Sequence, residues 1–134
     1  MEKLVISASA KFEKEILEWK NKLGKNFDVT KYPEKISGDF LINYSMEFKN
    51  HYSYINDADI LFILNLEKNG KKGYIGPGVF AEIAYAIGLN LTLGKKIKIY
   101  LLNNFADDLM CSEELSFWLD LGWIKMWSEK TPSI

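Results

Sequence analysis

Short apolar runs along the chain alternate with longer segments in which apolar residues recur every three or four positions. The apolar runs predict buried strands at residues 4–6, 27–30, 60–64, 97–102 and 123–127. The run Ile60-Leu61-Phe62-Ile63-Leu64 contains no polar residue, which is typical of a parallel strand that is covered on both faces. The chain is therefore expected to begin with a strand and to return to a strand after each helical segment.

The helical spacing of apolar residues predicts four helices, at residues 12–23, 39–55, 77–93 and 113–119. In the first of them, charged residues fill the positions between the apolar ones, as in an amphipathic surface helix. The helix at 77–93 is apolar on nearly every side, so we expect it to be central and buried.

Strands that alternate with helices indicate an α/β protein with a parallel sheet. Five strands in 134 residues fit a single domain, residues 1–134, with a flavodoxin-like or Rossmann-like three-layer fold and the strand order 2-1-3-4-5. In such sheets the ligand lies beyond the carboxyl ends of the strands, near the switch point between the first and third strands. The segments after these two strands are therefore the first places to look for a site.

Charge and cysteine usage narrow the class of partner. The chain has 17 Lys+Arg and 18 Asp+Glu, a net charge of −1, which gives no electrostatic attraction to a nucleic-acid polymer or an anionic membrane. The single cysteine, Cys111, cannot form an internal disulfide, and no Cys/His spacing matches a zinc site. Without a signal peptide or a membrane-spanning stretch, we expect a cytoplasmic protein that binds a small molecule and holds no metal.

Glu82 is the only charged residue between Pro77 and Leu93. A carboxylate on such an apolar helix has two explanations: stabilisation by the helix N-terminus, or a catalytic role at the floor of a pocket. We favour the catalytic explanation, because the positions around Glu82 are apolar.

Several residues near the favoured sheet edge are candidate ligand contacts. Ser7 and Ser9 follow the first strand and can bind a phosphate or simply cap the next helix. The segment from Gly73 to Gly78 allows close backbone approach to a ligand, although glycine and proline also mark ordinary turns. Within it, Tyr74 can stack on a base or serve the core.

The other ionisable residues are weaker candidates. His51 is the only histidine, and its position in the chain predicts a packing or surface role, remote from the favoured edge. Asp57 and Asp59 lie at the amino end of the third strand, which is the wrong edge for a ligand site.

Three segments together resemble the nucleoside 2-deoxyribosyltransferase superfamily, and an uncharacterised branch of it in particular. They are Asp59-Ile-Leu-Phe-Ile-Leu-Asn65, Tyr74-Ile-Gly-Pro-Gly-Val-Phe-Ala-Glu82-Ile-Ala-Tyr-Ala86, and the lysine-bearing turn and strand from Lys95 to Leu102. The resemblance implies a flavodoxin-like fold, cleavage of the N-glycosidic bond of a nucleoside or nucleotide, no cofactor, and a homodimer or larger homo-oligomer.

By this resemblance Glu82 is the nucleophile that attacks the anomeric carbon of the sugar, and helix-terminal N–H groups would keep it ionised. The implied substrate contacts are Ser7, Ser9, Asn65, Tyr74, Gly76, Gly78 and Asn103. Classical members have an aspartate where this chain has Asn65, and an amide cannot deliver a proton as an acid does. Hydrolysis is therefore slightly favoured over transfer.

Two other functions remain open. A non-catalytic nucleotide-sensing module on the same fold would account for the missing aspartate. A flavin-binding electron carrier would share the strand order, but the loop after the first strand lacks a full hydroxyl-rich phosphate cradle.

Overall fold

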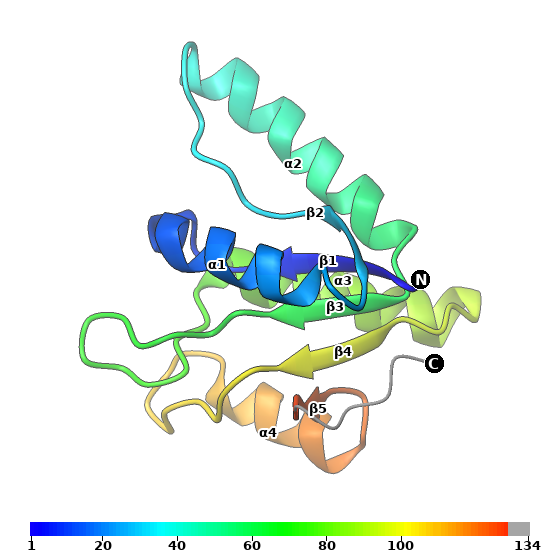
Figure 1. Ribbon diagram of the computed structural model, residues 1–134. Coiled ribbons are helices and arrows are strands. Elements are labelled where there is room, and N and C mark those ends of the chain that lie inside the picture. Colours follow the sequence, from blue (N-terminus) through cyan, green and yellow to red (C-terminus); the bar gives the residue numbers. More distant parts are fainter. Residues whose placement is uncertain (129–134) are drawn as a thin grey trace.

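The computed structural model describes residues 1–128 and contains one sheet of five parallel strands in the order β2-β1-β3-β4-β5 (Figure 1). The strands are β1 (Lys3–Ser7), β2 (Asp28–Lys31), β3 (Ile60–Ile63), β4 (Lys98–Leu101) and β5 (Lys125–Met126). The predicted fold class and strand order are confirmed. Four of the five strands lie within one residue of their predicted bounds at each end, whereas β5 is shorter than the predicted 123–127.

Helices cover both faces of the sheet. They are the 3₁₀ helix η1 (Ala10–Phe12), α1 (Glu13–Leu23), α2 (Phe40–Asn56), α3 (Pro77–Leu93) and α4 (Ser112–Asp120). Side chains alternate across β1, so Leu4 and Ile6 pack with α1 in one core, whereas Val5 packs with α2, α3 and α4 in the other. The α1 side is completed by Trp127, whose ring contacts Phe62.

Helix α3 begins and ends at the predicted residues, but the expectation that it would be buried on nearly every side is wrong. Its sheet-facing residues Ile83 and Ala86 are fully buried, whereas Tyr85, Leu91 and Leu93 are exposed. The physical reason is that α3 has the sheet on one side only, so one apolar face is left uncovered.

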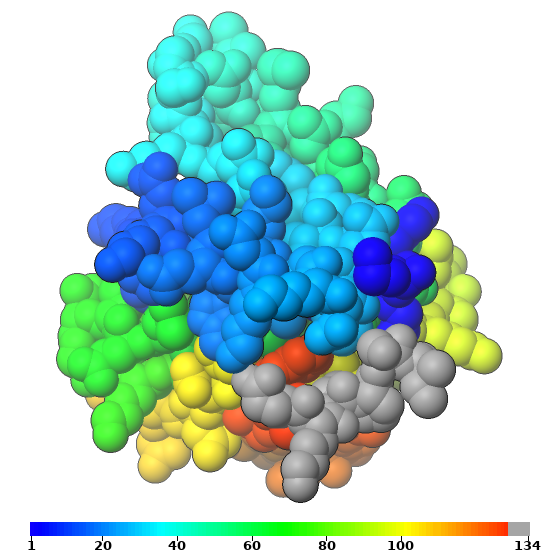
Figure 2. Space-filling view, viewed as in Figure 1, coloured from blue at the N-terminus to red at the C-terminus, as the bar shows by residue number. Residues whose placement is uncertain are grey.

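Helix α2 lies partly off the body of the molecule. Its C-terminal end is buried through Ile55, while its N-terminal half projects away from the sheet (Figures 1 and 2). Asp39 caps it by accepting a hydrogen bond from the backbone N–H of Ile42. An ion pair of 2.7 Å between Lys31 of β2 and Glu47 fastens α2 to the sheet edge.

Among residues 1–128, the helices are all too short or too polar to cross a lipid bilayer.

Candidate functional site

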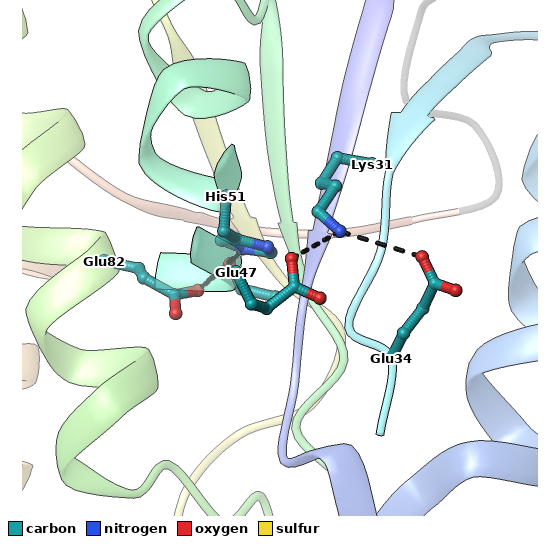
Figure 3. A network of polar contacts seen from close by, with 6 residues as sticks. Lys31, Glu34, Glu47, His51 and Glu82 are labelled. Atoms are coloured by element: carbon teal, nitrogen blue, oxygen red, sulfur yellow. Dashed lines mark hydrogen bonds and ion pairs between the residues drawn. The ribbon is translucent and has the colours of Figure 1, made fainter. Parts of the chain in front are cut away.

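Two polar side chains from two different elements converge on one carboxylate oxygen of a third. The Ser7 hydroxyl donates to Oε1 of Glu82 at 2.5 Å, and Nε2 of His51 lies 3.0 Å from the same oxygen. Ser7 Oγ and His51 Nε2 are themselves 3.4 Å apart. Figure 3 shows His51 and Glu82 pointing toward one another from α2 and α3. We call this group the Glu82 cluster.

The topology of the sheet brings the cluster together. Ser7 is the last residue of β1 and pairs with Ile63 at the carboxyl end of β3, so it marks the switch point between these strands. The loop after β3 leads into α3, which carries Glu82. The crossover from β2 to β3 carries α2 over β1, and this places His51 above Ser7.

Burial makes these contacts strong. Ser7 is fully buried and His51 is 6% exposed, while the Glu82 side chain keeps 18% exposure. Hydrogen bonds to a charged acceptor in such surroundings are stronger than those between neutral groups. Both donors approach Oε1, and among the described residues no hydrogen bond or ion pair is found to Oε2 of Glu82. The carboxylate is therefore anchored through one of its two oxygens.

The position of Glu82 corrects one sequence-based expectation. Glu82 lies beyond the first turn of α3, which itself contains no acidic residue. The helix-terminal N–H groups expected to hold the carboxylate act mainly within that first turn. The side chains of Ser7 and His51 hold it instead.

The expectation that His51 would be remote from the favoured sheet edge is also wrong. The sequence did contain a signal for its inward position. His51 lies one helical turn before Ile55, and the two share the buried face of α2. The chain crosses β1 on its way from β2 to β3. This crossover and the periodicity of α2, taken together, would have placed His51 near the end of β1.

The pKa of Tyr52, an aromatic neighbour of the Glu82 cluster, is raised. Burial raises the pKa of the Tyr52 phenol above its ordinary value of 10.0, and the nearby carboxylate of Glu82 raises it further. Tyr52 stacks on Phe48 of α2 and contacts the Tyr85 ring of α3, with ring centroids 4.4 Å and 5.0 Å apart.

Asn65 and Asn103 form a reciprocal clamp between the ends of β3 and β4. The Asn65 amide accepts from the backbone N–H of Asn103 at 3.0 Å and donates to its carbonyl at 2.7 Å. The Asn103 amide donates in turn to the Asn65 carbonyl at 3.0 Å, and a weaker bond of 3.4 Å joins Asn65 to the Gly73 carbonyl. Contact of these asparagines with a substrate stays a prediction, and a ligand at Asn65 would have to replace these bonds.

The glycine-rich segment is held against the loop after β4. Gly73 has φ of +59°, and a Cβ there would lie 2.0 Å from the Asn104 carbonyl oxygen, so this turn requires glycine. Gly76 is the N-cap of α3, while Gly78 faces open space. These positions let α3 start close to the carboxyl end of β3.

The remaining predicted contacts lie on both sides of this segment. The Ser9 hydroxyl caps no helix and instead accepts a bond of 3.4 Å from the Lys68 ammonium, which also lies 4.7 Å from the centroid of the Tyr74 ring. Tyr74 and Gly76 line a cavity of about 470 Å³ between the starts of α3 and α4, and Glu82 is not among its lining residues. Of the predicted substrate contacts, Ser7 belongs to the Glu82 cluster and two line this cavity, whereas the other four belong to neither: Ser9, Asn65, Gly78 and Asn103.

The cavity also contains Cys111. Burial raises the pKa of the Cys111 thiol, and the thiol lies 3.7 Å from the Ile75 carbonyl oxygen as a weak donor. A thiol held protonated in this way is a poor nucleophile.

Within the described part of the chain, His, Cys, Asp and Glu side chains do not gather in any group of three that could hold a metal ion. Compared with the known protein families, with curated proteins and with solved structures, the chain matches none.

Proposed function

We propose that this protein cleaves the N-glycosidic bond of a nucleoside or nucleoside monophosphate, with Glu82 as the nucleophile. The observation that carries the proposal is the anchoring of Oε1 by Ser7 and His51 while Oε2 has no partner among the described residues. A carboxylate fixed through one oxygen is oriented for attack by the other, and orientation of this kind lowers the barrier to reaction.

In the proposed reaction, Oε2 of Glu82 attacks the anomeric carbon and forms an ester bond to the sugar. The bond from that carbon to the base nitrogen breaks, and the base leaves with the electron pair and takes up a proton from water. A second water molecule then attacks the anomeric carbon of the glycosyl ester. This step releases the free sugar and regenerates the carboxylate, as in retaining glycosidases.

Hydrolysis suits the residues better than transfer. Asn65 stands where the resembled transferases have an acid, and its amide is bonded to backbone groups of Asn103 and Gly73. It can neither protonate a departing base nor deprotonate an incoming one. We further propose that the protein acts in the cytoplasm as a homo-oligomer on a small-molecule substrate.

The same observation on Asn65 supports a second candidate function. A module that binds a nucleotide without cleaving it needs no acid for the departing base. In that case Glu82 would accept hydrogen bonds from sugar hydroxyls in place of attacking the sugar.

The experiment incubates the pure protein with a panel of nucleosides, nucleoside monophosphates and their deoxy forms, and measures free base by chromatography. We expect base release from at least one substrate, loss of at least a hundredfold in Glu82→Gln, and unchanged release in Glu18→Gln, an exposed glutamate of α1. Equal release by Glu82→Gln, or no release from any substrate, would refute the proposal.

Intact mass spectrometry separates the two candidate functions. With a sugar carrying fluorine at C2, which slows hydrolysis of the glycosyl ester, the protein should gain the mass of one glycosyl group on Glu82. Tight nucleotide binding with neither base release nor added mass would favour the sensing module.

A further inference from the structure

The cavity between the starts of α3 and α4 has the size and the lining of a small-molecule site. Its volume of about 470 Å³ lies within the range of about 300–1,000 Å³ that is usual for such sites. The segment that leads into α3 forms one wall, and the segment that leads into α4 forms the other. The apolar side chains that line it include Ile75, Pro77, Phe80, Leu109 and Met110. Such a lining suits the flat, apolar part of a ligand.

The cavity and the Glu82 cluster lie on different sides of α3. Phe80 lines the cavity, and its ring stacks on Trp118 of α4 with the ring centroids 5.0 Å apart. Glu82 follows two residues later and bonds to Ser7 and to His51 of α2. Two residues correspond to about 200° around an α-helix, so the two side chains leave α3 in nearly opposite directions. A ligand in the cavity would therefore not contact the Glu82 carboxylate.

The two walls of the cavity are tied to one another. The backbone N–H of Ala106, in the loop after β4, donates to the carbonyl oxygen of Lys72, in the loop after β3, at 2.9 Å. The rings of Phe80 and Trp118 are inclined by only 8°, so α3 and α4 are also packed through a stacked pair. A site with walls fixed in this way loses little conformational freedom when a ligand binds.

The charges that line the cavity sum to one negative charge. They belong to Lys71, Asp108 and Glu114. The Lys71 ammonium and the Asp108 carboxylate form an ion pair of 2.6 Å, so these two charges cancel. The Glu114 carboxylate has no ion pair within residues 1–128. It is therefore the charge that a ligand in the cavity would meet.

The field of Glu114 acts inside the cavity, as the Cys111 thiol shows. Burial raises the pKa of this thiol, and the Glu114 carboxylate raises it further because it disfavours a second negative charge nearby. The same Coulomb interaction favours a positive charge at this place. Since the thiol is held protonated, it adds no charge of its own.

We propose that this cavity is a binding site, separate from the Glu82 cluster, for a small planar aromatic molecule that carries a positively charged amine. The aromatic ring would pack against the apolar walls, and the ammonium group would pair with Glu114. Met110 lines the cavity and is fully exposed, so its flexible thioether side chain can pack over the ring. The proposal does not rest on the proposed function, because Glu82 takes no part in it.

Alkylation of the Cys111 thiol by iodoacetamide at pH 8, followed by intact mass spectrometry, measures occupancy. Cys111 is the only cysteine and lines the cavity, so the rate of its alkylation reports this site. The probes are tryptamine, the neutral 3-methylindole and the anion indole-3-propionate, which share a ring system and differ in charge. With a dissociation constant of about 1 mM, about 5 mM tryptamine should slow alkylation about sixfold. The same concentration of indole-3-propionate should slow it less than about twofold.

Two neighbouring glutamates in the first turn of α4 provide a matched pair of variants. Glu114→Gln should weaken the binding of tryptamine about threefold, as expected for an exposed ion pair, and leave that of 3-methylindole unchanged. The control, Glu113→Gln, removes the same charge from the same turn but outside the cavity lining, and should bind tryptamine as the wild type does. Each rate is compared with that of the same variant without ligand, because Glu114→Gln also changes the reactivity of the thiol.

The absence of protection by all three compounds would overturn the proposal, and so would equal protection by tryptamine and indole-3-propionate. An effect of Glu113→Gln as large as that of Glu114→Gln would remove Glu114 as the partner of the amine and overturn it as well. Protection by tryptamine should persist in Glu82→Gln. Its loss in that variant would place the ligand at the Glu82 cluster and refute a separate site.

Discussion

The substitution Asn65→Asp restores the acid found in the resembled transferases, and we expect it to lower the free energy of unfolding of this protein. The hydrogen-bond network fixes which atom of the Asn65 amide is which, because Oδ1 receives the backbone N–H of Asn103 and Nδ2 faces two carbonyl oxygens. In Asn65→Asp the second carboxylate oxygen would lie about 3 Å from those carbonyl oxygens. A donor would be replaced by a charge facing two acceptors, in a side chain that is 1% exposed.

The magnitude follows from the bonds lost. The substitution removes the donor to two carbonyl groups, those of Asn103 and Gly73. Each carbonyl left without a donor costs about 1–3 kcal/mol. We expect Asn65→Asp to lower the free energy of unfolding by about 3 kcal/mol at pH 7. For a chain of this length that is a fall in Tm of roughly 12 °C, at about 4 °C for each kcal/mol.

The effect should depend on pH with a defined sign. Burial and the two carbonyls favour the protonated form of the introduced carboxyl, so its pKa in the folded state is raised above the unfolded value of about 3.9. The unfolded state then binds fewer protons at intermediate pH, and stability is lost as pH rises through the folded-state pKa. The deficit relative to wild type should be large at pH 7 and should shrink toward pH 4, where the protonated carboxyl can donate to the Asn103 carbonyl.

Urea unfolding followed by circular dichroism at pH 4, 5.5 and 7 measures this deficit. Asn65→Ala should be destabilised with no such pH dependence, and Asn104→Asp, in the exposed loop next to the clamp, should change little at any pH. A variant as stable as wild type at pH 7, or a deficit that does not narrow in acid, would contradict the clamp. An increase in base release by Asn65→Asp would show that position 65 serves the chemistry.

Two further predictions concern the glycine-rich loop and Tyr52. Gly70 and Gly73 both have positive φ, but only at Gly73 would a Cβ meet backbone atoms. In urea unfolding, Gly70→Ala should therefore lower the free energy of unfolding by about 1 kcal/mol and Gly73→Ala by about 3 kcal/mol or more. Equal losses in the two variants would contradict the close contact between Gly73 and Asn104. Glu82→Gln should lower the pKa of Tyr52 and still leave it above 10.0, because burial is the larger cause of the raised pKa and remains in the variant. The titration of Tyr52 is obtained by recording absorbance at 295 nm against pH and subtracting the curve of the same protein that also carries Tyr52→Phe. A Tyr52 titration unchanged by Glu82→Gln would show that Glu82 does not raise this pKa.

The sequence was sufficient for the fold because the strands and helices follow local patterns. The unbroken apolar run that begins at Ile60 and the apolar spacing of residues 77–93 can be recognised without knowledge of tertiary contacts. The contacts of His51 and Asn65 are not, because each depends on how two distant segments are packed. A polar residue at the end of a buried strand, such as Asn65, has the same local pattern whether it binds a ligand or ties two loops together.

Glu82 links the chemistry of the proposed site to the position of α2. A carboxylate that is four-fifths buried loses much of its hydration, and hydrogen bonds from Ser7 and His51 offset that loss. Ser7 is fixed by β1, which lies between β2 and β3, so this donor cannot move far. His51 lies on the buried face of the C-terminal half of α2 and is 6% exposed. Its distance from Glu82 is set by the packing of α2 against α3. The bonding of Glu82 therefore depends on how these two helices are packed, as well as on the sheet.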